Sequence, residues 1–303
     1  MESYQKATAS FETVTDFLRF GLSLANKTPL YYGHGTDNAW DDVLALVLGS
    51  LSLTHEVEPM LLHARLTPDE RTHLTKQLER RMLEHVPVPY LTHRAYFFDL
   101  PFYVDERVLI PRSPIAELIG AQFSPFIEAD QVERILDLGT GSGCIAIACC
   151  HAFPDAFVDA VDISREALEV AQMNRVQHGV ETQLKLLQSD CFDALPHATY
   201  DLIISNPPYV GADEMKGLPK EYQHEPELAL YAPNNGLEIV EKMLFSASKY
   251  LSKHGILVME VGNSEAALVS AYPNVPFTWL EFESGGTGVF LLTAAELNQY
   301  FKR

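Results

Sequence analysis

Residues 134–150, RILDLGTGSGCIAIACC, give the strongest indication of the fold. The first part of this stretch, Arg134-Ile135-Leu136-Asp137-Leu138, is a short apolar run of the kind that forms a buried strand. The run leads into Gly139-Thr140-Gly141-Ser142-Gly143, and an apolar segment typical of a helix follows. Glycines let a backbone turn tightly and approach a ligand, and the first turn of a helix has free N–H groups. The stretch predicts a strand, a glycine turn and a helix that bind a nucleotide-like cofactor.

Two further strands with polar ends follow this helix. Asp162 lies at the end of the strand expected over residues 156–163, and Asp190 at the end of the strand expected over residues 184–190. A carboxylate about 20 positions after a glycine turn suits hydrogen bonds to ribose hydroxyls, which is the role expected for Asp162. The residues placed to frame an adenine ring are Asp190, Cys191 and Phe192.

The glycine spacing departs from the dinucleotide pattern G-x-G-x-x-G, because Cys144 stands where the third glycine would fall, and this argues against NAD. Asp162 and Asp190 also have a simpler interpretation as helix caps, and Phe192 as core packing. In open parallel sheets, however, ligands bind at the carboxyl ends of the strands. We therefore expect one crevice to collect Gly139, Asp162, Asp190 and Asn206.

The next apolar strand, Ile203-Ile204-Ser205, runs directly into Asn206-Pro207-Pro208-Tyr209. Proline has a fixed backbone and no N–H group, so the proline carbonyls only accept hydrogen bonds. Asn206 adds a side-chain acceptor and Tyr209 a flat aromatic face. Together they suit a planar group that carries an NH2, such as an amide or an aminopurine. A strand that ends in a proline-rich turn is the plain alternative.

These motifs, in this order, resemble the HemK family of S-adenosylmethionine-dependent protein glutamine methyltransferases, and most of all its PrmB branch. The resemblance extends over nearly the whole chain. The segments that carry it are residues 137–143 (DLGTGSG), 161–164 (VDIS), 189–190 (SD), 206–209 (NPPY), 32–38 (YGHGTDN), 102–107 (FYVDER), 222–227 (YQHEPE) and 276–281 (PFTWLE). It implies S-adenosylmethionine as cofactor and, as substrate, a glutamine of the third protein of the large ribosomal subunit.

The resemblance also implies the roles of individual residues. The cofactor-binding residues are then Gly139, Thr140, Gly141, Gly143, Asp162, Ile163, Asp190, Cys191, Phe192 and Asn206. The substrate-binding residues are Asn206, Pro207, Pro208 and Tyr209, of which Asn206, Pro207 and Tyr209 are catalytic. In the release-factor branch an aromatic residue directly follows the third-strand acid and covers adenine. Whether Cys191 or Phe192 covers adenine here therefore stays open.

Residues 111–117, PRSPIAE, differ from the release-factor branch, in which Pro-Arg-Pro precedes an acid, Thr and Glu. This difference favours a ribosomal protein as substrate. A release factor is the alternative substrate, and a cofactor-binding ribosome-assembly factor without activity is the alternative of a different class. The intact motif at 206–209 disfavours the second. Arg112, Glu225 and Glu227 are either ligand contacts or surface charges, and the sequence leaves both open.

Residues 1–90 are predicted to form a small helical domain that recognises the substrate. Apolar residues recur at helical spacing from Phe11 to Leu24, and Asn38 is placed to cap a second helix through Leu51. Residues 67–70, TPDE, match a capping box for a third helix.

Residues 91–112 are expected to form a β-hairpin linker that turns around Asp99-Leu100-Pro101. Residues 113–303 are expected to form the methyltransferase domain. Strands alternate there with helices, which predicts an α/β fold: a Rossmann-like, doubly wound class I methyltransferase sheet. Segments 277–283 and 288–293 are predicted to form its antiparallel end.

The chain has 303 residues, of which 47% are hydrophobic and 21% charged, as in a globular protein large enough for two domains. Its formal net charge is −19, and neither residues 1–131 nor residues 132–303 are basic. Phosphates repel such a chain, so an enzyme that methylates DNA amino groups is disfavoured. A basic ribosomal protein, before it assembles onto RNA, is a better partner. Solubility alone is the alternative explanation of the acidity.

No apolar run has membrane-spanning length and no cleavable signal is evident near the start, so a cytoplasmic location without membrane binding is expected. The 4 cysteines lack Cys-x-x-Cys spacing and are interpreted as small buried apolar residues in a reducing compartment. The 11 histidines are scattered, and no metal site is expected.

Overall fold

The computed structural model describes residues 2–196, 198–283 and 285–302, which divide into two compact units. The helical unit consists of the chain up to Ala95 together with Val104–Glu106 and Pro219–His224. The sheet unit consists of Tyr96–Tyr103, Arg107–Leu218 and the chain from Glu225 onward. One short segment from the second half of the chain therefore belongs to the helical unit.

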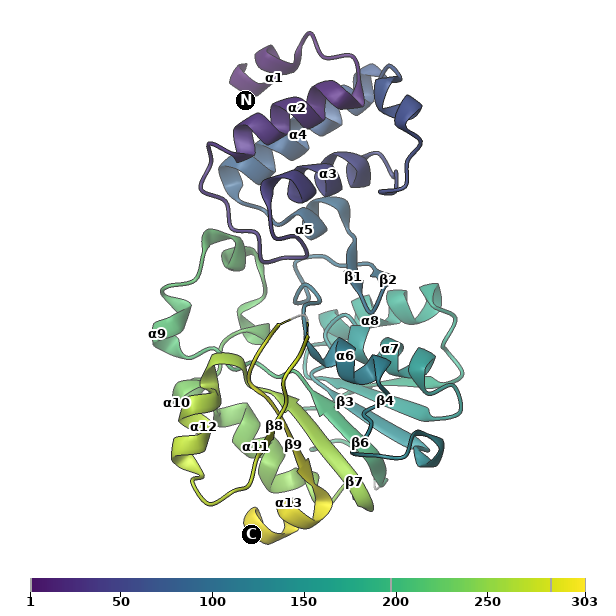
Figure 1. Cartoon of the computed structure of the whole chain (residues 1–303), viewed down its shortest axis with the longest axis vertical. Helices are drawn as coiled ribbons and strands as arrows, with labels where there is room; N and C mark the ends of the chain where they lie inside the picture. The colour runs from purple at the N-terminus through teal and green to yellow at the C-terminus, as the bar shows by residue number, and fades with distance from the viewer. Residues whose placement is uncertain (1, 197, 284, 303) are drawn as a thin grey trace. The chain divides into compact units, whose positions relative to one another are not determined.

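The helical unit contains α1 (Glu2–Thr8), α2 (Val14–Ala25), α3 (Ala39–Ser50), α4 (Pro68–Glu84), α5 (Val88–Thr92) and the 3-10 helices η1 (Pro59–His63) and η3 (Lys220–His224) (Figure 1). The predicted caps are present. The Asn38 side chain accepts the Asp41 N–H at 3.0 Å. At the start of α4, Thr67 and Glu70 each accept the other's backbone N–H. These residues satisfy N–H groups that a helix start leaves without partners.

Helices α2, α3 and α4 pack closely around Gly21. A Cβ atom at Gly21 would lie 2.8 Å from Val43 of α3 and 3.0 Å from Leu78 of α4. Phe17, Leu46 and Leu74 are fully buried in the same unit. Apolar burial is the main stabilising contribution in such a small bundle.

A buried group of charges also belongs to the helical unit. The Arg81 side chain is 1% exposed and donates to both carboxylate oxygens of Asp42, at 2.8 and 3.2 Å. It also donates to Oε1 of Glu221, which η3 supplies, at 3.2 Å. The same oxygen accepts the Tyr31 N–H at 2.9 Å and lies 3.2 Å from Nδ1 of His85. Removal of one partner would leave charge buried without compensation, which is strongly destabilising.

The predicted hairpin is present but shorter than expected. It consists of β1 (Ala95–Phe97) and β2 (Leu100–Phe102), so its turn lies at Phe98 and Asp99. Both turn residues have positive φ, 53° and 57°, as a two-residue hairpin of type I′ requires. The expected turn was one residue further along the chain.

The sheet of the second unit has seven strands in the order β5-β4-β3-β6-β7-β9-β8. They are β3 (Arg134–Leu138), β4 (Phe157–Asp162), β5 (Leu184–Gln188), β6 (Tyr200–Ser205), β7 (Leu251–Glu260), β8 (Thr278–Trp279) and β9 (Val289–Thr293). Strands β3 to β7 are parallel, and β9 pairs antiparallel with both β7 and β8. The predicted α/β fold with an antiparallel end is confirmed, and β8 is shorter than expected.

Helices cover both faces of this sheet (Figure 1). Leu202 and Ile204 of β6 pack in one core with α6 and α7, whereas Ile203 packs in the other with α11, α12 and α13. This alternation follows from the two-residue period of a strand. The helices of the unit are α6 (Ile115–Gly120), α7 (Cys144–Ala152), α8 (Arg165–Gln177), α9 (Ala212–Met215), α10 (Pro233–Gly236), α11 (Glu238–Ala247), α12 (Glu265–Ala271), α13 (Ala294–Tyr300), η2 (Ala129–Gln131), η4 (Glu227–Ala229) and η5 (Gly262–Ser264).

Candidate active site

The carboxyl ends of β5, β4, β3 and β6 lie side by side at one edge of the sheet. Leu138, the last residue of β3, pairs with Val161 of β4 and with Ser205 of β6. The next residues, Gly139 and Asn206, are therefore neighbours, and a Cβ atom at Gly139 would lie 3.9 Å from the Asn206 carbonyl oxygen. The structure thus brings the glycine turn, the end of β4 and the Asn-Pro-Pro-Tyr segment together.

The glycine turn has a backbone that favours glycine. Gly139, Gly141 and Gly143 have φ of +74°, +54° and +82°. The N–H groups of Gly139 and Thr140 donate to the Val161 carbonyl oxygen at 2.8 and 2.9 Å, which fixes the turn against β4. A Cβ atom at Gly141 would meet no other atom within 4 Å. The turn is therefore open at Gly141, where a ligand can approach the backbone.

Asp162 links the glycine turn to the helix that follows β4. Its Oδ2 accepts the Gly141 N–H at 2.9 Å, and its Oδ1 accepts the Ser164 N–H at 2.8 Å. Burial raises the pKa of Asp162. A carboxylate has about four acceptor positions, so capacity remains for a ligand with hydroxyl groups. The neighbouring residue, Ile163, is 49% exposed.

Asp137, on β3, is a polar residue of this region that was not predicted as a site residue. It is 1% exposed, and its Oδ2 accepts the Thr140 hydroxyl at 2.6 Å. Its Oδ1 has no hydrogen-bond partner among the described residues. Burial raises the pKa of Asp137 to about 7. An acid inside an apolar strand directly before a glycine turn was the signal in the sequence.

The residues expected to frame adenine follow β5. Asp190 is about half exposed and pairs with Lys242 at 2.9 Å. Cys191 has a left-handed backbone, with φ of +50°, and is buried. The Phe192 ring is 4% exposed and stacks on Tyr250, with ring centroids 4.7 Å apart. Phe192 therefore belongs to the hydrophobic core, and Tyr250 covers one face of its ring.

The segment Asn206-Pro207-Pro208-Tyr209 begins immediately after β6. The hydroxyl of Ser205 donates to the Leu138 carbonyl oxygen at 2.7 Å and fixes the strand end. Pro207 is buried, while Asn206 and Tyr209 are half-buried. The Tyr209 hydroxyl donates to Oε1 of Glu260 at 2.8 Å, and the Ser264 hydroxyl donates to the Tyr209 carbonyl oxygen at 2.7 Å.

Arg112 and Glu225 form a tight ion pair in the sheet unit. The Arg112 guanidinium donates to both oxygens of Glu225 at 2.6 Å, and the Ile110 N–H donates to Oε1 at 3.1 Å. The Glu225 side chain is fully buried. Glu225 is therefore not a solvated charge, whereas Glu227 is exposed.

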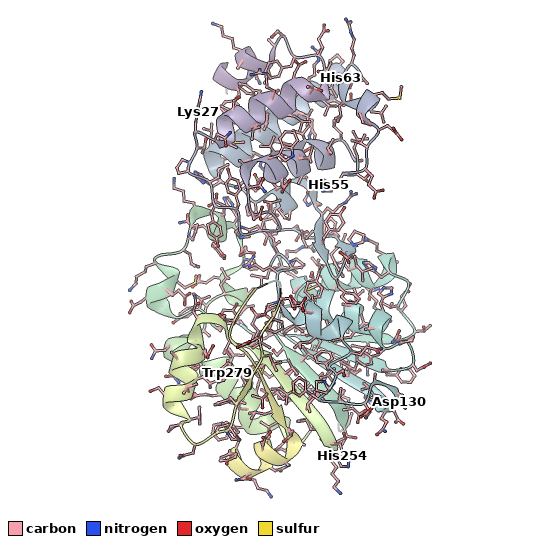
Figure 2. All side chains as sticks on the ribbon, viewed as in Figure 1. Lys27, His55, His63, Asp130, His254 and Trp279 are labelled. Atoms are coloured by element: carbon pink, nitrogen blue, oxygen red, sulfur yellow. The ribbon has the colours of Figure 1, made fainter. Side chains whose placement is uncertain are left out.

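His55 and His63 lie at separate places on the helical unit (Figure 2). No group of His, Cys, Asp or Glu that could hold a metal ion occurs in the part of the chain that the structure describes.

Cys149, Cys150 and Cys191 are buried, and burial raises the pKa of Cys191 to about 12. Within the described ranges, none of the helices combines the length and the hydropathy that a membrane span needs.

This sheet architecture also occurs in known methyltransferases. The family model of the methyltransferase small domain matches residues 122–218. The fold is similar to that of the hMettl16 catalytic domain, solved with the MAT2A 3'UTR hairpin 1, at a TM-score of 0.50 and 19% identity, over 77% of this chain and 83% of that one. The chain therefore has the Rossmann-like α/β fold of the class I methyltransferases.

Curated relatives narrow this class. The chain is 46% identical over 295 residues to the ribosomal protein uL3 glutamine methyltransferase of Neisseria gonorrhoeae. This match covers 97% of this chain and 98% of the relative. The chain is equally similar to the protein of that name from Neisseria meningitidis serogroup B, over 97% of each chain. The chain belongs to the family of ribosomal protein uL3 glutamine methyltransferases. The resemblance to PrmB-type protein glutamine methyltransferases is thereby confirmed.

Proposed function

We propose that this protein transfers a methyl group from S-adenosylmethionine to the side-chain amide nitrogen of a glutamine in ribosomal protein uL3. The observation that carries the proposal is the position of Asn206, beside Gly139 of the glycine turn, in a chain 46% identical to uL3 glutamine methyltransferases. A cofactor seated on the turn would then lie next to a segment suited to an amide.

The residues present fit S-adenosylmethionine. Its methionine part suits the open glycine turn formed by Gly139, Thr140, Gly141 and Gly143, where a ligand can approach the backbone. Asp162 retains acceptor capacity for ribose hydroxyls, with Ile163 beside it. The cofactor supplies an electrophilic methyl group on a positively charged sulfur.

We assign adenine to Asp190, Cys191 and Phe192, at the end of the neighbouring strand β5. Of the two candidates for its face, Cys191 fits better, because Tyr250 already covers one face of the Phe192 ring. Asp190 is half exposed beside Lys242, where it can accept a hydrogen bond from an exocyclic amino group.

The chemical difficulty of the reaction is the amide nitrogen, whose lone pair is delocalised into the carbonyl group. The Asn206 side-chain oxygen and the Pro207 carbonyl oxygen are proposed to accept the two amide hydrogens and to aim the nitrogen at the methyl group. As the nitrogen becomes tetrahedral and positive, these acceptors stabilise it more than they stabilise the neutral amide. The carbon–sulfur bond would break with its electron pair leaving on S-adenosylhomocysteine, and the methylated nitrogen would pass one of its protons to an accepting oxygen and on to solvent. A strong general base is not required. Pro208 restricts the backbone, and Tyr209 stacks on the amide plane and excludes water.

The acidity of the chain supports free uL3 as the form of the substrate. Ribosomal proteins are rich in Lys and Arg, and a net charge of −19 attracts such a protein before it assembles onto RNA. The reaction would then take place in the cytoplasm. Assembled uL3 brings RNA phosphates, which repel an acidic enzyme.

Mass spectrometry tests the proposal directly. Purified protein is incubated with S-adenosylmethionine and purified uL3, free or assembled in the large subunit, and the expected result is one added methyl group on a glutamine of free uL3. The Asn206→Ala variant is the control for contaminating activity. Methylation of a purified release factor instead of uL3 would establish the alternative substrate. Cofactor binding without transfer to either protein would indicate a non-catalytic assembly factor.

A further inference from the structure

Tyr209 is held at three points by residues of the sheet unit. Its hydroxyl donates to Oε1 of Glu260 at 2.8 Å, and its carbonyl oxygen accepts the Ser264 hydroxyl at 2.7 Å. Its ring rests on Gly262, where a Cβ atom would lie 2.5 Å from Cε2 of the ring. Because prolines fix the backbone before Tyr209, the Tyr209 ring can move mainly through its own side-chain torsions. These contacts remove that freedom.

Glu260 is the last residue of β7 and lies at the same sheet edge as Asn206, since β6 and β7 are parallel. It is 5% exposed. Its Oε1 accepts the Tyr209 hydroxyl, and its Oε2 accepts the Ser113 hydroxyl at 2.6 Å. Both oxygens of the carboxylate therefore hold hydroxyl groups in place.

A buried carboxylate is a costly way to fill this position. Burial raises the pKa of Glu260, which reflects the loss of hydration of its charge. An apolar side chain of similar volume would fill the space without that cost. The charge also interacts with the nearby Arg112 guanidinium, but the two hydrogen bonds of the carboxylate go to the hydroxyls of Tyr209 and Ser113. The orientation of the Tyr209 ring is a use that an apolar residue cannot supply.

Gly288, just before β9, packs against the backbone that carries the Tyr209 ring. The Gly288 carbonyl oxygen accepts the Val261 N–H at 2.7 Å, and any Cβ atom at Gly288 would collide with Gly262. Glycine at this position therefore allows the chain before β9 to pack directly against the Gly262 backbone, on which the Tyr209 ring rests. This accounts for glycine at position 288.

We propose that Glu260 is a positioning residue for methyl transfer, which fixes the Tyr209 ring against the acceptor amide through the Tyr209 hydroxyl. The proposal rests on the proposed function. Glu260 touches neither cofactor nor substrate in this assignment and acts only through Tyr209. Its loss should slow the transfer step and leave cofactor binding intact.

A double-mutant cycle in the full chain tests the proposal with purified uL3, by single-turnover methylation and by calorimetric titration of S-adenosylmethionine. Glu260→Ala is expected to slow transfer about tenfold to hundredfold, as loss of a hydrogen bond to a charged group does. Tyr209→Phe is expected to slow it about tenfold. The double variant should be no slower than the slower single variant, because both changes remove the same contact. The dissociation constant of S-adenosylmethionine should not change.

Two further variants separate positioning from general loosening of the fold. Glu260→Gln keeps an oxygen for the Tyr209 hydroxyl and an N–H group for Ser113, so it is expected to restore most of the rate. Tyr200→Phe is the matched control. The Tyr200 hydroxyl also donates to a buried carboxylate, Asp159, at 2.8 Å, but Tyr200 begins β6 at the strand end opposite Asn206. This control is expected to lower the melting temperature and to keep the rate.

Several results would overturn the proposal: a full rate for Glu260→Ala, losses that multiply in the double variant, or an equal loss in the Tyr200→Phe control. If Glu260→Ala does not fold, a slow Glu260→Gln variant that binds S-adenosylmethionine normally would likewise refute it. Failure of the proposed function is distinguishable, because the wild-type protein would then leave uL3 unmethylated. In that case the proposed function fails first, and a role of Glu260 in methyl transfer to uL3 fails with it.

Discussion

The buried carboxyl group of Asp137 makes the stability of the cofactor-free protein depend on pH. Burial raises the pKa of Asp137 from 3.8 to about 7. The folded protein therefore binds this proton more tightly than the unfolded chain, and the contribution to stability is full below the lower value and is lost as the pH rises toward the higher one. At about 1.4 kcal/mol per pH unit, the shift corresponds to about 4 kcal/mol.

The Asp137→Asn variant isolates this effect, because its amide carries no charge at any of these pH values. The new amide oxygen can accept the Thr140 hydroxyl, whereas its NH2 group would replace the carboxylate oxygen that has no partner among the described residues. That replacement costs about 1–3 kcal/mol at every pH. The informative quantity is therefore the pH dependence of the difference between variant and wild type, not its value at one pH.

The assay is urea denaturation of both proteins from about pH 4 to pH 8, without cofactor. Relative to the wild type, the variant is expected to gain about 4 kcal/mol in free energy of unfolding over this range. The Thr140→Val variant lacks the hydroxyl that donates to the ionised carboxylate, so it should lose more stability at high pH than at low pH. Parallel curves for wild type and Asp137→Asn would refute the assigned shift and its cause.

Three other substitutions are expected to separate catalysis, cofactor binding and stability. Asn206→Ala removes one acceptor and should raise the barrier to methyl transfer by about 2.7–4 kcal/mol in single-turnover assays, with binding of S-adenosylmethionine largely kept. Asp162→Ala removes the acceptor of the Gly141 N–H, which is also the proposed acceptor for ribose hydroxyls, so calorimetric titration should show weaker cofactor binding. Glu221→Ala leaves Asp42 as the only carboxylate on the buried Arg81 guanidinium among the described residues and should lower the free energy of unfolding by about 3 kcal/mol in urea.

Each of these expectations has a result that contradicts it. Unchanged turnover in Asn206→Ala would remove Asn206 from the mechanism. A normal dissociation constant of S-adenosylmethionine for Asp162→Ala would count against the ribose role of Asp162. Asp162→Asn keeps one acceptor and is the control, which should bind like the wild type. For Glu221, the Glu221→Gln variant is the control of equal size. Wild-type stability in both variants would show that the ion group of the helical unit does not stabilise it.

Local chemistry was predictable from the sequence where a short segment carries its own partners. Asn38 and the pair Thr67 and Glu70 cap their helices as expected, because each accepts an N–H only three residues away. The expected position of the hairpin turn was one residue too late, because Phe98, unlike Asp99, belongs to a residue type that rarely adopts a positive φ. Short helix α5 is absent from the sequence-based expectations, because Pro87 and Pro89 at its start are also typical of the end of a preceding helix.

The strand-end residues of the candidate site were predictable because a parallel sheet brings its carboxyl ends to one edge. Contacts between distant segments were not. Asp190 pairs with Lys242, and Phe192 stacks on Tyr250, through packing that no short motif encodes. Glu260 was missed although it also ends an apolar strand at the same edge. The same strand-end rule, applied to β7, would have found it.

The placement of Glu221 also has a consequence for the order in which the chain is made. The helical unit takes most of its residues from the chain up to Ala95, but Pro219–His224 complete it. During synthesis, Arg81 and Asp42 therefore emerge long before Glu221, the second carboxylate that pairs with Arg81. The first helices can assemble early, yet their buried charges reach full compensation only after more than two thirds of the protein has been translated. A fragment that stops near residue 95 would lack this last component, and its Arg81 guanidinium would have one carboxylate fewer.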